Sequence, residues 1–349
     1  MSSNKRIQFL QPIQTPENLL NTLPLSPNSE NVVNKARQEI EAVLSGQSNK
    51  LVVVVGPCSI HDPNSALEYA RFLKSQIDLY HQDLVIVMRT YFSKPRTTVG
   101  WKGFINDPNL NNTFQINEGL FQSRQLLLQI LDLGVPCAME QLDTILPQYF
   151  NDLLSWSAIG ARTTESQVHR ELASGISTPI GFKNSTDGNI VVAIQGIKCS
   201  QKPHNFLGCN MQGQICAVQT QGNPYGHLIL RGSRHGPNYS PRQIQEAEQK
   251  LEENNLPQQI FIDFSHDNSA KDYQKQILVA ENVCHQISQG SYSIKGVMIE
   301  SHLLEGKQNI NDKPLIYGKS ITDGCVNLQT TEQMFNLLVQ AKKNRELVR

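Results

Sequence analysis

Short apolar runs recur along the chain from residue 51 onward, and segments with helical periodicity separate them. The runs cover residues 51–55, 84–88, 135–139, 158–161, 179–182, 227–230, 259–262 and 294–299. Several are continuously apolar, which is typical of strands covered on both faces. Eight strands joined by helical segments predict an α/β fold, a (β/α)8 barrel. A doubly wound open sheet is the alternative, because the number of strands does not prove closure.

Capping signals mark the starts of three helices. Asp62 followed by Pro63 predicts an N-cap with proline at the first helical position. The stretches 164–167 and 240–243 both match the capping box, in which a hydroxyl and a Glu or Gln side chain bond the first free amides. Apolar residues at helical spacing over 31–44 predict a further helix near the N-terminus.

The domain organisation follows from where the regular alternation is absent. Residues 1–48 are rich in Asn, Gln, Pro and Ser, and we expect them to form an N-terminal extension for assembly or regulation. Residues 49–349 then form the catalytic barrel. The segment at about 202–226 is too long for an ordinary loop before the sixth strand. Its two β-like stretches, 205–209 and 215–219, predict an inserted β-hairpin.

Charge and cysteine content exclude several classes of protein. The 349 residues carry 31 Lys and Arg against 31 Asp and Glu, so a general affinity for nucleic acid or for an anionic membrane is not expected. The apolar runs are far shorter than the roughly 20 residues of a membrane helix, and we find no signal-peptide pattern. Seven cysteines without a C-x-x-C pair argue against a disulfide framework. We therefore expect a cytoplasmic protein.

Basic side chains follow most of the strand-like runs. In a barrel the carboxyl ends of the strands meet at one rim, where the chemistry of such enzymes takes place. Six cations at corresponding positions would be costly to gather without strong anions, and phosphate and carboxylate are their natural partners. We infer a ligand that carries several negative charges. The cations are Arg89, Lys94, Arg96, Arg162, Lys183 and Arg231.

A second group of strand-end residues has metal-binding chemistry. Cys58 follows the first run, His266 the seventh and Glu300 the eighth, and Asp323 lies further on. The first, seventh and eighth strands are neighbours in a closed barrel, so a mixed sulfur, nitrogen and oxygen site for one divalent transition metal is expected. The pattern leaves three other possible ligands open, namely His61, His169 and His302.

These segments closely resemble the type I 3-deoxy-D-arabino-heptulosonate 7-phosphate (DAHP) synthases. The matching stretches include GPCSIHDP (56–63), KPRTTVGWKG (94–103), GARTTESQVHRELASG (160–175), DFSH (263–266), ESHLLEG (300–306) and YGKSITD (317–323). The resemblance implies a metal-dependent, aldol-like condensation of phosphoenolpyruvate with erythrose 4-phosphate, which releases phosphate and opens the shikimate pathway to the aromatic amino acids.

The resemblance also implies roles for individual residues. The metal ligands are expected to be Cys58, His266, Glu300 and Asp323. The phosphate of phosphoenolpyruvate is expected at Arg162 and Arg231 with backbone near Glu140 and Ala161, and its carboxylate at Arg89, Lys94 and Lys183. The phosphate of erythrose 4-phosphate is expected at Arg96 and Thr97. Lys94 is the expected proton donor, and His266 is a second candidate for proton transfer. The metal is expected to be manganese, iron, cobalt or zinc.

Members of this family are often inhibited by one aromatic amino acid and assemble as homodimers or homotetramers. Positions of the inhibitor pocket match Pro147, Gln148, Ser177 and Phe206. At one further position, phenylalanine-sensitive members tend to carry serine and tyrosine-sensitive members glycine. This chain has Gly208 there, which favours tyrosine. Gly208 serving only the hairpin backbone is the alternative.

Two rival functions stay open at this point. Another sugar-acid synthase that uses phosphoenolpyruvate, such as the one that makes 3-deoxy-D-manno-octulosonate 8-phosphate, would share the barrel, but the stretches at 94–103 and 160–175 argue against it. The other is a catalytically silent barrel that senses phosphorylated metabolites or aromatic amino acids. A complete set of metal ligands argues against a sensor.

Overall fold

The centre of the molecule is a closed ring of eight parallel strands. In the computed structural model, which describes residues 4–96 and 100–348, the order around the ring is β1-β10-β9-β8-β5-β4-β3-β2. The prediction of a (β/α)8 barrel is therefore confirmed, and the open-sheet alternative is wrong. The strands are β1 (Leu51–Gly56), β2 (Leu84–Arg89), β3 (Cys137–Glu140), β4 (Leu154–Ile159), β5 (Ile180–Lys183), β8 (Gly226–Leu230), β9 (Ile260–Asp263) and β10 (Ile294–Glu300).

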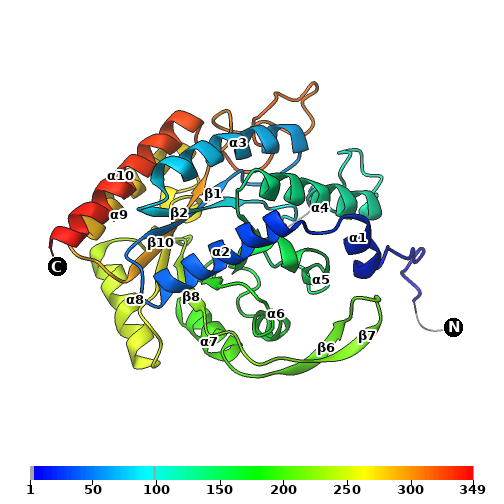
Figure 1. Cartoon of the computed structure of the whole chain (residues 1–349), viewed down its shortest axis with the longest axis horizontal. Helices are drawn as coiled ribbons and strands as arrows, with labels where there is room; N and C mark the ends of the chain where they lie inside the picture. The colour runs from blue at the N-terminus through cyan, green and yellow to red at the C-terminus, as the bar shows by residue number, and fades with distance from the viewer. Residues whose placement is uncertain (1–3, 97–99, 349) are drawn as a thin grey trace.

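Helices surround this ring (Figure 1). Asp62 caps α3 by accepting from the Asn64 amide at 3.0 Å, and Ser240 forms the predicted capping box at the start of α8. Both predicted starts are confirmed. The helices outside the N-terminal extension are α3 (Pro63–Tyr80), α4 (Ile116–Asp132), α5 (Pro147–Phe150), α6 (Gln167–Ala173), α7 (Val191–Ser200), α8 (Pro241–Glu253), α9 (Gln276–Ser288) and α10 (Leu328–Leu347), with short 3₁₀ turns η1 (Asn151–Leu153), η2 (His266–Ser269) and η3 (Tyr273–Lys275).

Two predictions around β4 were wrong. The strand was expected at 158–161, but it covers Leu154–Ile159, because the fully buried Ser155 and Ser157 interrupt the apolar pattern. The capping box at 164–167 does not form. Residues 160–164 make a turn, with the Thr164 amide donating to the Gly160 carbonyl at 3.0 Å. The helix α6 begins at Gln167 without a side-chain cap.

The N-terminal segment contains two helices, α1 (Pro16–Thr22) and α2 (Pro27–Leu44). The helix expected over 31–44 is thus confirmed and begins one turn earlier. In Figure 1, α2 crosses in front of the barrel. Its residues Ile40 and Val43 join the cluster that fills the amino-terminal end of the barrel, and Arg37 Nε donates to the Leu154 carbonyl at 2.9 Å. The helix α2 therefore closes the end of the barrel opposite the expected site.

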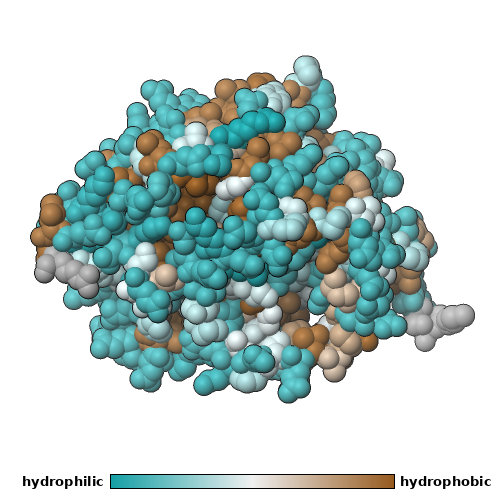
Figure 2. Space-filling view, viewed as in Figure 1, coloured by the Kyte–Doolittle hydropathy of each residue, from teal (hydrophilic) through white to brown (hydrophobic). Residues whose placement is uncertain are grey.

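The inserted hairpin forms where the sequence predicts it. Its strands β6 (Asn205–Cys209) and β7 (Ile215–Gln219) pair antiparallel, away from the barrel sheet. Neither strand is covered by the core, and the side chains of Leu207 and Ile215 are largely exposed. Figure 2 shows apolar surface over this hairpin and in patches elsewhere on the same face. Within the described ranges, no helix is long and apolar enough to cross a membrane.

One histidine lies inside the barrel core. His227 on β8 accepts a hydrogen bond from Trp156 Nε1 at its Nε2, 3.1 Å away, and contacts the ring of Phe261. Its Nδ1 lies 3.1 Å from the Tyr225 carbonyl and donates to it when the ring is neutral. A second proton would have to replace the indole contact. Burial lowers the pKa of His227 to about 4.

This histidine makes the stability of the protein dependent on pH. Because its pKa is about 6.5 in the unfolded chain and about 4 in the fold, the unfolded state binds more protons between these values. Stability should fall as the pH drops from 6.5 toward 4, with His227 contributing a loss of about 2 kcal/mol by pH 5. Urea unfolding of His227→Gln should show a shallower pH dependence. The exposed His285→Gln variant is the control, and equal slopes in both variants would contradict this origin.

Candidate active site

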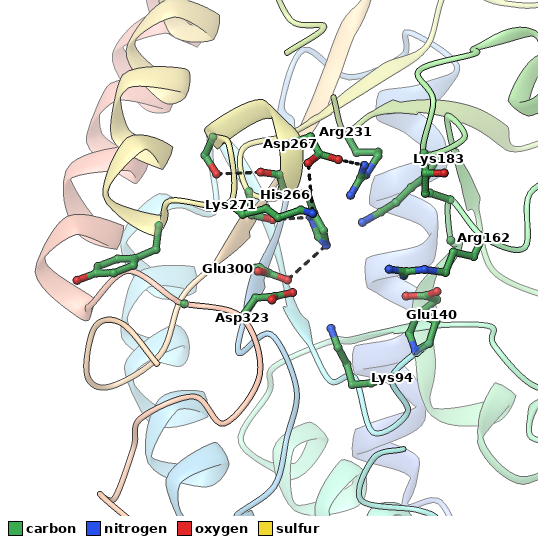
Figure 3. A pocket seen from close by; sticks show the side chains of 18 of the residues that line it. Lys94, Glu140, Arg162, Lys183, Arg231, His266, Asp267, Lys271, Glu300 and Asp323 are labelled. Carbon is green, nitrogen blue, oxygen red and sulfur yellow. Dashed lines mark hydrogen bonds and ion pairs between the residues drawn. The ribbon is translucent and has the colours of Figure 1, made fainter. Parts of the chain in front are cut away.

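The carboxyl ends of the strands surround a cavity of about 730 Å³. Figure 3 shows Glu300 and Asp323 on one side of it and Arg162 and Lys183 on the opposite side, with Glu140 beside Arg162. Among the described residues, eleven of the predicted substrate or metal residues line it, and they come from seven different strands or the loops that follow them. These are Arg89, Lys94, Arg96, Glu140, Ala161, Arg162, Lys183 and Arg231 from the substrate set, together with His266, Glu300 and Asp323 from the metal set.

Three of the predicted metal ligands form a compact group. The thiol of Cys58 and the carboxylates of Glu300 and Asp323 each offer an atom, and these atoms lie within 4.8 Å of one another. Cys58 Sγ is 3.7 Å from Asp323 Oδ2. Burial, followed by the charge of Glu300, raises the pKa of the Cys58 thiol. A thiol and two carboxylates this close together suit a divalent metal, which would hold the sulfur as thiolate.

His266 lies beside this group, outside the compact set. Its Nε2 is 3.8 Å from Glu300 Oε1, and its Nδ1 is 2.8 Å from Asp263 Oδ2. Because Nδ1–H can donate to this carboxylate, the lone pair of Nε2 is available to coordinate a metal. The backbone of His266 has φ +57°, a left-handed conformation that is uncommon outside glycine, and such positions cluster at functional sites.

Two carboxylates balance the deepest cations. Arg89 Nη2 donates to Glu300 Oε1 at 2.8 Å, and Lys183 Nζ to Asp263 Oδ2 at 2.8 Å, with all four side chains at most 5% exposed. Burial alone would raise the pKa of Asp263, but the charges of His266 and Lys183 hold it well below 3.8. The site is therefore a network of coupled charges in which one carboxylate holds both a basic side chain and a candidate metal ligand.

The other cations are nearer the mouth of the cavity. Arg231 is paired with Asp267, and Arg162 lies next to Glu140 in Figure 3. Lys94 Nζ is 3.1 Å from Cys58 Sγ, so one ammonium stands between the metal-type group and the cations. Arg96 is exposed, and its Nε donates to the Trp101 carbonyl at 2.8 Å. Thr97 lies outside the described residues.

The three alternative histidine ligands have other surroundings. His61 and His302 lie together, with ring centroids 6.4 Å apart, and burial lowers the pKa of His302 to about 3. His169 is bonded to Ser166 Oγ and to the Leu142 carbonyl, at 2.8 and 3.0 Å. None of the three lines the cavity as it is described.

The residues expected to form an inhibitor pocket come from three elements on one side of the barrel. Pro147 and Gln148 begin α5, Ser177 precedes β5, and Phe206 and Gly208 lie on β6. Figure 1 shows α5, α6 and the hairpin as neighbours. The loop after α6 is tied to the base of the hairpin by Ser174 and Thr220, whose hydroxyl oxygens are 2.6 Å apart.

Sequence reasoning missed several residues of the cavity. Asp267 and Lys271 line it beside Arg231, and Thr186, Arg234 and Tyr273 are among its other lining residues. Asp267 directly follows the DFSH stretch, and an acidic side chain next to a predicted ligand at a strand end was a usable signal. Lys271 had none, because it enters the cavity only through the turn η2 and the left-handed residues that follow it.

The barrel is closed, and cations lie around one part of its mouth while a metal-type group lies across from them. This arrangement is typical of an enzyme that acts on phosphorylated substrates. Comparison with known proteins gives the family. The model of the DAHP synthetase I family matches residues 26–336, and the chain belongs to this family.

Relatives extend over nearly the whole chain. The chain is 51% identical over 341 residues to the Phe-sensitive phospho-2-dehydro-3-deoxyheptonate aldolase of Escherichia coli, covering 97% of each chain. It is 48% identical to the Tyr-sensitive enzyme of Salmonella typhimurium over 335 residues, 95% of this chain and 94% of that one. A structure of phospho-2-dehydro-3-deoxyheptonate aldolase from Francisella tularensis is similar with a TM-score of 0.96 and 49% identity, over 97% of this chain and 99% of the other.

Loss of the Asp263 charge should destabilise the whole rim. In Asp263→Asn the buried ammonium of Lys183 loses its anion, so we expect a loss of about 3–5 kcal/mol in the free energy of unfolding. Urea titration at fixed protein concentration measures it. Glu246→Gln, which breaks the exposed pair with Arg242, is the matched control and should cost less than about 1 kcal/mol. Equal losses in the two variants would show that the buried pair stabilises the fold no more than the exposed pair does.

Proposed function

We propose that this chain is a 3-deoxy-7-phosphoheptulonate (DAHP) synthase, which condenses phosphoenolpyruvate with D-erythrose 4-phosphate in the first step of the shikimate pathway. The observation that carries the proposal is that Glu300 and Asp323, which form a group with the buried Cys58, face a wall of cations across one cavity. Two substrates with phosphate groups need the cations, and an aldehyde needs an electrophilic activator beside them. Membership in the family supports the same reaction.

Phosphoenolpyruvate fits five of the cations that line the cavity. Arg162 and Arg231 bind its phosphate, with the backbone near Glu140 and Ala161, and Arg89, Lys94 and Lys183 bind its carboxylate. The depth of the residues supports this order, because Arg89 and Lys183 are almost fully buried while Arg231 is nearer the mouth. Arg96 and Thr97 bind the phosphate of erythrose 4-phosphate, whose aldehyde then points inward.

The residues of the acidic side fit a divalent transition metal. Cys58, His266, Glu300 and Asp323 would hold it, because thiolate, imidazole and carboxylate suit manganese, iron, cobalt or zinc better than calcium or magnesium. Asp263 would fix the His266 ring for this role through its Nδ1 contact. When bound, the metal polarises the aldehyde oxygen as a Lewis acid.

The protein then brings the reacting carbons together. The cations hold two anions that would otherwise repel each other. Such positioning lowers the activation free energy by roughly 7–11 kcal/mol. Carbon 3 of phosphoenolpyruvate bonds to the aldehyde carbon, water adds at carbon 2, and phosphate leaves when its bond to carbon 2 breaks. We assign to Lys94 the proton that turns the aldehyde oxygen into the new hydroxyl, and the position of its Nζ, 3.1 Å from the Cys58 sulfur, supports this role.

The first test follows the absorbance of phosphoenolpyruvate with erythrose 4-phosphate present. Turnover should stop on chelation and return with manganese. Cobalt added to the chelated protein should give a thiolate charge-transfer band that is lost in Cys58→Ser and kept in Cys284→Ser, whose buried thiol is on α9. A protein that binds phosphoenolpyruvate but shows no turnover with metal present would favour the sensor. Turnover with arabinose 5-phosphate in place of erythrose 4-phosphate would favour the other sugar-acid synthase.

We also propose that the enzyme is inhibited by tyrosine. Relatives sensitive to phenylalanine, tyrosine and tryptophan are 51%, 48% and 48% identical to this chain, so overall similarity does not choose among them. Gly208 supports tyrosine: a Cβ there would lie 3.9 Å from Phe206 Cε2, and its absence leaves room near that ring for a hydroxyl. The same Cβ would meet Val218 Cγ2 at 2.6 Å, which supports the alternative that Gly208 serves the hairpin.

Inhibition assays separate these explanations. At equal concentrations, tyrosine should slow the reaction more than phenylalanine or tryptophan. Phe206→Ala should lose about tenfold or more in sensitivity, as expected when one aromatic contact of a small ligand is removed. Asn205→Ala, on the other face of β6, is the control and should keep it. Inhibition by phenylalanine alone would overturn the proposal.

A homo-oligomer accords with the exposed apolar residues of the hairpin. Leu207 and Ile215 are 82% and 84% exposed, and Phe9 and Leu10 near the N-terminus are 73% and 76% exposed. Exposed apolar groups of this kind mark contact surfaces. We propose that the hairpin and the N-terminal segment contact a second copy of the chain, in a homodimer or homotetramer. A cytoplasmic location stays a prediction.

A further inference from the structure

The cation expected to bind the phosphate of phosphoenolpyruvate is already paired with an anion of the protein itself. Arg231 Nη1 forms an ion pair with Asp267 Oδ2, and the two side chains are 9% and 16% exposed. Both residues line the cavity, and Figure 3 shows the pair at its edge. An incoming phosphate must therefore share the guanidinium with a carboxylate or displace it.

The backbone holds Asp267 in this place. Asn268, the next residue, donates from Nδ2 to the Leu230 carbonyl at 3.0 Å and to the Asp263 carbonyl at 2.8 Å, which anchors the turn η2 to the ends of β8 and β9. Gly232 lets the two segments touch. A Cβ there would lie 2.6 Å from the Asp267 carbonyl carbon and 2.5 Å from the Asn268 amide nitrogen. The turn thus fixes the carboxylate next to Arg231.

A second cation, Lys271, lies close to the Asp267 carboxylate. Lys271 Nζ lies 3.7 Å from Asp267 Oδ1, its side chain is 69% exposed, and it also lines the cavity. The buried pair of Lys183 and Asp263 differs, because Asp263 also holds His266 and both side chains are at most 5% exposed. Asp267 can therefore change partners, whereas Asp263 cannot without releasing a candidate metal ligand.

We propose that Asp267 is an internal competitor that weakens the binding of the phosphoenolpyruvate phosphate at Arg231. When phosphate enters, the carboxylate moves its hydrogen bonding to Lys271. After the reaction, the carboxylate pairs with Arg231 again, and this favours the dissociation of inorganic phosphate. Asp267 is thus a specificity and affinity residue for the phosphate group. The inference rests on the proposed assignment of Arg231 to this phosphate.

Removal of the charge should tighten anion binding. In Asp267→Asn we expect the Kd for phosphoenolpyruvate, measured by calorimetry on chelated protein, to fall about tenfold, the scale of coupling between close charges shielded from water. The KM for phosphoenolpyruvate and the inhibition constant of inorganic phosphate should fall with it, and by more than kcat changes. Asp272→Asn is the matched control, because Asp272 pairs with Lys275 outside the cavity at 3.7 Å.

Lys271→Met tests the change of partner. Without its second cation the carboxylate should stay on Arg231, so the Kd and the KM for phosphoenolpyruvate should rise several-fold. In Asp267→Asn/Lys271→Met this rise should shrink to a small residual, since the competitor is gone. A rise of the same size in both backgrounds would mean that Lys271 contacts the ligand directly, and would overturn the exchange.

The outcomes separate this inference from the assignment beneath it. If Arg231→Gln leaves the Kd for phosphoenolpyruvate unchanged, the assignment of Arg231 is wrong. If Arg231→Gln weakens binding but Asp267→Asn leaves it unchanged or weakens it too, Asp267 only orients the guanidinium and the competitor is ruled out. If Asp267→Asn does not fold, Asp267→Ala takes its place. Should both fail, Lys271→Met decides, and an unchanged Kd there overturns the proposal.

Discussion

Burial of charge at the carboxyl ends of β9 and β10 is the constraint on which the rest of the site depends. Asp263 and Glu300 end neighbouring parallel strands, and each neutralises a cation that could not otherwise be held so deep. Removing charges from water costs several kcal/mol per ion unless partners are close and fixed. Asp263 also orients His266. The same carboxylate therefore stabilises the buried ammonium of Lys183 and fixes the ring of a candidate metal ligand.

The barrel supplies the rigidity that this arrangement needs. Its core is packed from end to end, with Trp156, His227 and Phe261 inside and α2 closing the amino-terminal end. Side chains at the opposite rim are therefore displayed from strands that cannot shift independently. Pre-organised charge of this kind stabilises a reacting system without the reorganisation that water would require. The functional contrast is between such deep, fixed pairs and the pair of Arg231 and Asp267, which lies nearer solvent and has an exchange partner.

Much of this architecture could be predicted from sequence because it depends on local pattern. Continuous apolar runs located seven of the eight barrel strands closely, and the hairpin strands matched at every residue. The failure at β4 has a physical cause: Ser155 and Ser157 are buried but satisfied, with Ser157 Oγ accepting from Gln141 Nε2 at 2.9 Å, and tertiary partners of this kind leave no trace in the local pattern. The rim residues were found because strand ends in a barrel converge.

The sequence by itself determined the alternation of strands and helices, the helix-capping signals at Asp62 and Ser240, and which strand ends carry cations and metal-type ligands. Only the tertiary structure decided which charge meets which. Glu300 pairs with Arg89, 211 positions away, because the barrel closes. Asp267 pairs with Arg231 because the two backbones approach each other at Gly232. Local periodicity is set by neighbours along the chain, whereas the pairing of charges is set by distances across the closed sheet.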